Sequence, residues 1–207
     1  TVMHAVIVNR SGRTLGLAAA LLALVAAPAW AHTGVGPVHG ALHGFAHPLG
    51  GWDHLLAMVA VGLWAAQRTG KAVWLIPAGF VLGMVGGGML GMGGVAMPAV
   101  EAGIVFSVML LGALVAAAIR PPLVASVLLV AFFGMLHGHA HGAEMPAAVS
   151  GISYALGFVA ATALLHASGV FAALGLRRLA SQPTSLRAVR LVGSAIAAAG
   201  VLLAVVR

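Results

Sequence analysis

The sequence has no cysteine and very few charged residues. Of its 207 residues only 6% are Asp, Glu, Lys or Arg, whereas 62% are hydrophobic, and the mean hydropathy is +1.11. A soluble domain needs about a quarter charged residues to cover its surface, so the composition excludes one. We therefore expect an all-α, polytopic membrane protein whose apolar helices cross the bilayer.

The absences also restrict the chemistry. Without cysteine there are no disulfides and no thiolate ligands, so a bound metal would need nitrogen, oxygen or thioether ligands. No G-x-x-x-x-G-K-[ST] phosphate loop is present, so the chain is not expected to be an ATPase. The formal net charge of +7 comes without the interleaved aromatics of single-strand binders. We expect membrane lipid as a partner and no nucleic acid.

The first residues have the pattern of a secretory signal peptide. Two arginines precede an apolar core over residues 15–27, and an A-x-A cleavage site ends at Ala31. The alternative is an uncleaved membrane helix, but the core is shorter than the roughly 20 residues that span a bilayer comfortably. We therefore expect residues 1–31 to be removed and residues 32–207 to form a single membrane domain.

Six apolar segments follow, and the basic residues fall in alternate loops between them. The segments cover roughly 48–67, 72–93, 97–119, 121–140, 147–168 and 187–206. The loop residues are Arg68, Lys71, Arg120, Arg177, Arg178, Arg187 and Arg190. The positive-inside rule assigns these loops to the cytoplasm, which predicts a bacterial inner-membrane protein. Trp64 and Trp74 flank the first such loop, as expected for interfacial aromatics.

Glycines recur every four residues in the second segment, at Gly79, Gly83, Gly87 and Gly91. On a helix this spacing makes a stripe without side chains, against which a second helix can pack closely. We interpret the stripe as a packing surface rather than as the lining of a pore.

Two imidazoles and a carboxylate lie at the start of the first apolar segment. Proline fits the first turn of a helix, so a helix is expected to begin near Pro48. That helix would place His47 on the same side as His54, with Asp53 adjacent. Ionisable groups at the mouth of a membrane helix are costly to bury and are therefore functional candidates.

A second group lies at the end of the fourth apolar segment. On a helix His137, His141 and Glu144 face one way and His139 points away. The intervening glycines could open the helix and expose backbone carbonyls. The predicted topology places all three acidic residues, Glu101 among them, and most histidines at one membrane face, with His166 near the inner end of the fifth segment. This clustering indicates a metal site.

The two groups of residues resemble the signatures of the HupE/UreJ family of nickel permeases. The first is H-P-x-x-G-x-D-H-x-x-A-M-x-x-V-G over residues 47–62, and the second is H-G-x-A-H-G-x-E-x-P over residues 137–146. One departure is Leu136, where the family usually has an aromatic residue. By this resemblance the functional residues are His47, Asp53, His54, Glu101, His137, His141 and Glu144.

The resemblance implies uptake of Ni²⁺, or Co²⁺, as a transported substrate, for insertion into hydrogenase or urease. It implies a secondary transporter rather than an enzyme, with no prosthetic group. We add His32 as a capture ligand: if cleavage follows Ala31, its free α-amine and its imidazole could chelate a metal together.

Three other interpretations stay open at this point. An intramembrane metalloenzyme would use the same ligands, although no H-E-x-x-H helix and no Glu-x-x-His pair is present. A haem-binding subunit would normally have deeper histidines that are paired across helices. A copper(I) carrier could use the methionines of the second and third segments, Met84, Met89, Met92 and Met97.

Overall fold

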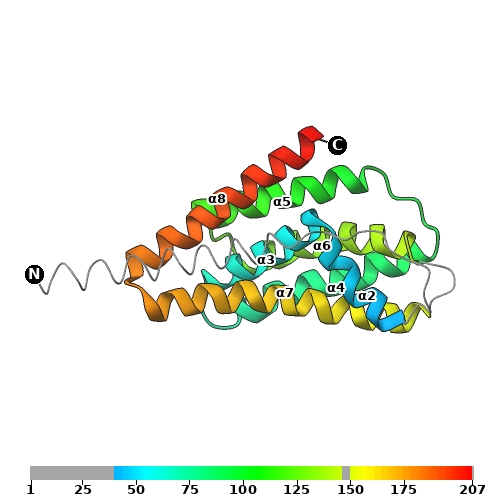
Figure 1. Ribbon diagram of the computed structural model, residues 1–207, viewed down its shortest axis with the longest axis horizontal. Coiled ribbons are helices and arrows are strands. Elements are labelled where there is room, and N and C mark those ends of the chain that lie inside the picture. The colour runs from blue at the N-terminus through cyan, green and yellow to red at the C-terminus, as the bar shows by residue number, and fades with distance from the viewer. Residues whose placement is uncertain (1–39, 146–149, 207) are drawn as a thin grey trace, which may run out of the picture.

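The structure is a computed structural model that describes residues 40–145 and 150–206. Over these ranges every regular element is a helix, as predicted. In chain order they are α2 (Gly40–Gly50), α3 (Trp52–Ala66), α4 (Ala72–Met92), α5 (Val100–Ala117), α6 (Leu123–Ala143), α7 (Gly151–Leu179) and α8 (Gln182–Val206) (Figure 1). The expected signal peptide and His32 lie outside the described residues.

Five of these helices, α4 to α8, are long and apolar enough to cross a membrane, and α2 with α3 makes a sixth span if the pair is counted as one. Large apolar side chains are exposed on the outside of the bundle, for example Leu82, Phe171 and Leu191. Such a surface suits lipid tails, which are as apolar as leucine. The chain is therefore a polytopic helical membrane protein.

The predicted helix start at Pro48 is wrong. Pro48 lies inside α2, and the helix breaks soon afterwards at Gly51, whose backbone is extended (φ −107°, ψ 122°). Proline removes one helical hydrogen bond and glycine weakens a helix, so the chain can bend here. The axes of α2 and α3 differ by 84°. His47 and His54 therefore come from two different helices.

The glycine stripe of α4 packs against α6, as predicted. A Cβ atom added at Gly83 would collide with the backbone carbonyl of Ala131, and one added at Gly87 with that of Met135. The two helices approach so closely that no side chain fits between them at these positions.

The glycines of α6 take part in the same contact. A Cβ atom at Gly138 would collide with the carbonyl of Met84, and one at Gly142 with that of Gly88. The helix runs through both glycines to Ala143, so the idea that they open it is wrong. The unbroken helix holds the side chains of its last two turns in fixed register.

The basic residues gather at one end of the bundle, in two connections and in the adjoining parts of α7 and α8. The loops between α3 and α4, between α5 and α6, and between α7 and α8 lie together at this end (Figure 1). Two helices reach further toward it than predicted, because α7 continues to Leu179 and α8 begins at Gln182. His166 is therefore in the middle of α7 and not near its inner end.

Unlike an interfacial aromatic, Trp64 does not face lipid. Its side chain is fully buried, and its Nε1 donates a hydrogen bond to the carbonyl of Ile119 at 2.8 Å. Trp74 is largely exposed, as an interfacial aromatic would be. Trp64 instead ties the end of α3 to the end of α5.

Candidate metal site

Four histidines from three helices meet at the end of the bundle opposite the basic loops. His47 comes from α2, His54 from the first turn of α3, and His137 and His141 from the last turns of α6. The ring centroids are 4.5 Å apart for His47 and His141, 3.9 Å for His141 and His54, and 4.4 Å for His54 and His137. The four rings, here named the imidazole cluster, thus form a continuous row.

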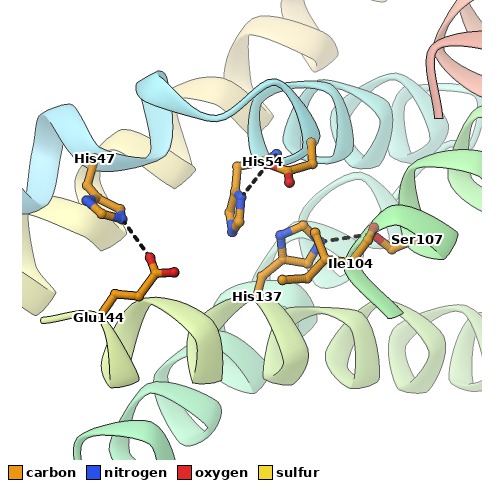
Figure 2. Close-up of polar contacts among 7 residues, drawn as sticks. His47, His54, Ile104, Ser107, His137 and Glu144 are labelled. Carbon is orange, nitrogen blue, oxygen red and sulfur yellow. Dashed lines mark hydrogen bonds and ion pairs between the residues drawn. The ribbon is translucent and has the colours of Figure 1, made fainter. Parts of the chain in front are cut away.

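The outer end of the row could hold a metal ion. One ligand atom each from His47, His141 and Glu144 lies within 4.8 Å of the other two. Figure 2 shows the side chains of His47 and Glu144 directed at each other, with 3.5 Å between Nε2 and Oε2. His141 is buried while Glu144 is exposed, so the group joins the surface to the interior. The bend between α2 and α3 is what brings His47 over the end of α6.

Asp53 orients the ring of His54. Its Oδ1 accepts a hydrogen bond from the His54 backbone N–H at 2.7 Å and lies 2.8 Å from His54 Nδ1. A carboxylate at this nitrogen favours the tautomer with hydrogen on Nδ1, which leaves the lone pair on Nε2. Figure 2 shows the His54 ring directed into the space between His137 and the His47–Glu144 pair. Asp53 therefore acts on the row through His54.

Ser107 of α5 plays the same part for His137. The Ser107 hydroxyl donates to the carbonyl of Ile104 at 2.6 Å and lies 2.8 Å from His137 Nε2 (Figure 2). Because the hydroxyl hydrogen is already used, its oxygen accepts from His137 Nε2–H, which leaves the lone pair on Nδ1. Ser107 was not predicted from the sequence, where its only signal is a serine in a helix that is apolar apart from Glu101.

Several nitrogens of the imidazole cluster are buried without a partner. Among the described residues, no hydrogen bond reaches His54 Nε2, His137 Nδ1 or either ring nitrogen of His141. Leaving a buried polar atom unpaired costs about 1–3 kcal/mol each. Nitrogens with free lone pairs, gathered from two helices, are what a transition metal requires.

Two aromatic residues of α7 pack beside the imidazole cluster and were also not predicted from the sequence. Phe158 packs on His141 with 4.4 Å between ring centroids, and Tyr154 lies 6.0 Å from His47. The Tyr154 hydroxyl is buried and has no hydrogen-bond partner in the described part of the chain. Nothing in the local sequence marks these two residues, because their contacts arise only when α7 packs on α2 and its side chains reach α6.

Glu101 and His139 lie outside the imidazole cluster. Glu101 is exposed in the first turn of α5 and lies outside the described metal-binding group. The ring Nε2 of His139 is 2.7 Å from the carbonyl of Val95. His139 therefore points away from the row, as its helix position predicted. His32 lies outside the described residues.

The fold and the site together define a polytopic membrane protein with a nitrogen- and oxygen-rich site at one end of its bundle. Residues 19–203 match the family described as "HupE / UreJ protein". The protein HupE of Rhizobium leguminosarum bv. viciae is 43% identical over 185 residues, which are 89% of this chain and 95% of that protein.

The chain belongs to the HupE/UreJ family, which consists of permeases and not of enzymes. The interpretation as an intramembrane enzyme is therefore wrong. No solved structure matches the chain.

Proposed function

We propose that this permease carries Ni²⁺, or Co²⁺, inward across the bacterial inner membrane. The observation that carries the proposal is the row of imidazoles with unpaired nitrogens, which begins beside exposed Glu144 and ends at buried His137. Imidazole and carboxylate ligands without thiolate suit these ions.

The row suggests an order of steps. The ion binds first to His47, His141 and Glu144, whose ligand atoms lie together between the surface and the interior. It then passes to His54 and His137, whose rings follow at centroid distances of 3.9 and 4.4 Å. Neighbouring rings are close enough for one ligand to bind the ion before the previous one releases it, so the ion does not have to be bare in the apolar interior.

The membrane potential can drive this movement. Two positive charges moving inward across 100 mV gain about 4.6 kcal/mol, which removes the need for ATP. The direction requires the imidazole cluster to face the periplasm and the basic loops to face the cytoplasm, as the positive-inside rule predicts.

Single cysteines can test this orientation, because the sequence contains none of its own. Ala143 ends α6 and Ser181 lies between α7 and α8, and both residues are exposed. The end of α6 and the connection between α7 and α8 are at opposite ends of the bundle (Figure 1). We expect an impermeant thiol reagent added to intact cells to label Ala143→Cys but not Ser181→Cys, and to label both after the cells are opened. The reverse pattern in intact cells would turn the proposal from uptake to efflux.

Uptake of radioactive nickel by cells without other nickel importers tests the substrate. We expect nickel uptake to depend on this chain. Excess cobalt should inhibit this uptake more strongly than excess zinc. A lack of nickel uptake by a correctly inserted protein would contradict the proposal.

Copper(I) is the second candidate because of one pocket between α4, α6 and α7. Met84, Met89 and Met92 line this pocket together with His141. Thioethers favour soft ions such as copper(I), although methionine is also a common filler of apolar gaps. Transport of copper(I) by this chain, together with inhibition of nickel uptake by copper(I), would favour this candidate.

We further propose that the imported metal serves maturation of a hydrogenase or a urease. The test uses a cell that has both enzymes. At limiting nickel, removal of the permease should lower the activity of the hydrogenase or of the urease, whichever enzyme receives the metal, and high external nickel should restore that activity. Unchanged activities at limiting nickel would contradict the link.

A further inference from the structure

His166 is a buried histidine that neither signature includes. It lies in the middle of α7 with 2% of its surface exposed, and neither ring nitrogen has a hydrogen-bond partner among the described residues. His139 offers a comparison, because it is also buried but is bonded to a backbone carbonyl. A polar side chain held unpaired inside a membrane protein is costly, and such residues commonly mark the path of an ion.

The aromatic ring of Phe80 on α4 separates His166 from the imidazole cluster. This fully buried ring lies 5.5 Å from the ring of His137 and 5.2 Å from that of His166, measured between centroids. The row of rings from the surface therefore continues through Phe80 to His166.

Two further groups that could bind a metal lie one helical turn from His166 and Phe80. Thr162 precedes His166 by four residues on α7, and Met84 follows Phe80 by four residues on α4. The Thr162 hydroxyl donates to the Met84 sulfur at 3.5 Å, and both groups are buried. The contact between α4 and α7 thus brings a hydroxyl, a thioether and an unpaired imidazole into the interior of the bundle.

We propose that His166 is an inner metal ligand, which receives the ion after it leaves His137. This inference rests on the proposed function and adds to it a step beyond the imidazole cluster. The Phe80 ring separates the two positions, so the ion has to pass its edge. An apolar separator of this kind prevents a continuous polar path, which would let protons or other ions leak across the membrane.

Replacement by residues of similar size can distinguish a ligand from a packing residue. His166→Leu removes both nitrogens, whereas His166→Met supplies a thioether that can bind the metal. His139→Leu is the matched control, because it removes a buried imidazole that lies outside the row. Uptake is measured per molecule of protein in the membrane, and Ni²⁺ binding is measured by equilibrium dialysis of the purified protein.

We expect His166→Leu to lower uptake by about tenfold or more, a loss typical of an altered metal site, while Ni²⁺ still binds to the imidazole cluster. His166→Met should recover a large part of the uptake, and His139→Leu should retain most of it. Wild-type uptake by His166→Leu would overturn the inference, and so would equal losses in the Leu and Met variants.

The two proposals fail in different ways. If the wild-type protein transports nickel and His166→Leu does as well, only the inner ligand is wrong. If the wild-type protein transports no nickel, the proposed function is wrong and the inner ligand falls with it.

Discussion

The two ends of the bundle treat their polar side chains differently. At the basic end, Trp64, Gln67 and Arg190 each donate a hydrogen bond to a backbone carbonyl in or just after α5, at 2.8, 2.8 and 2.6 Å. At the opposite end, His141 is buried and neither of its ring nitrogens has a partner in the described part of the chain. The three side chains at the basic end stabilise the fold through these bonds, although Gln67 Oε1 and Arg68 Nε are buried without a partner among the described residues. At the opposite end the imidazole nitrogens stay available for a ligand.

This difference separates structural polar residues from functional ones. A buried donor bonded to a carbonyl stabilises the protein by about 1 kcal/mol, whereas an unpaired one destabilises it. The imidazole cluster thus lowers stability unless a ligand binds it. The predictions below test whether transport depends on the cluster end and stability on the basic end.

The largest effect is expected for Asp53→Asn. The change keeps the size of the side chain but removes the negative charge that orients His54 and attracts a cation. Loss of such a partner costs about 10- to 100-fold at metal sites, so uptake of radioactive nickel should be nearly abolished. Abundance in the membrane, measured by immunoblot, should not change. Normal uptake by this variant would remove the region around Asp53 from the path.

Next in size is the contrast between His141→Ala and His139→Ala. His141 contacts His47 and His54, whereas His139 is bonded to Val95 outside the row. Uptake should fall strongly in the first variant and only weakly in the second, when both are compared per molecule. Equal losses of uptake would show that the metal does not distinguish the two histidines by the side of α6 on which they lie.

Much of this arrangement could be predicted because it depends on local periodicity. Apolar length predicted the spans, and helical spacing predicted that His141 shares a face with His137 while His139 does not. The break at Gly51 could not be predicted, because Pro48 is equally compatible with the first turn of a helix. Ser107 could not be assigned either, since it meets His137 only through the packing of α5 on α6.

A smaller effect is expected from residues before the described part of the chain. If processing follows Ala31, inserting one alanine between Ala31 and His32 moves the free α-amine away from the imidazole. The chelate would be lost while the imidazole remains, so uptake should fall at limiting nickel and persist at saturating nickel. Mass spectrometry would check the cleavage position. Unchanged uptake at limiting nickel would exclude His32 as a capture ligand.

The smallest effect on transport, and a clear effect on stability, is expected for Arg68→Gln at the basic end. Arg68 Nη2 donates to the carbonyl of Pro121 at 2.7 Å and to the Ser126 hydroxyl at 2.8 Å, so it ties the end of α3 to the start of α6. Hydrogen bonds from a charged donor contribute about 1.5–3 kcal/mol each, less where water competes.

Glutamine is too short to reach both acceptors and should lower the unfolding temperature in detergent, while Arg68→Lys, which keeps the charge, should lower it less. Nickel uptake per inserted molecule should stay near that of the wild type in both variants. Arg68 lies in the connection between α3 and α4, which is at the end opposite the imidazole cluster (Figure 1). Loss of transport without loss of stability would mean that the basic end also takes part in moving the ion, and the division between the two ends would then fail.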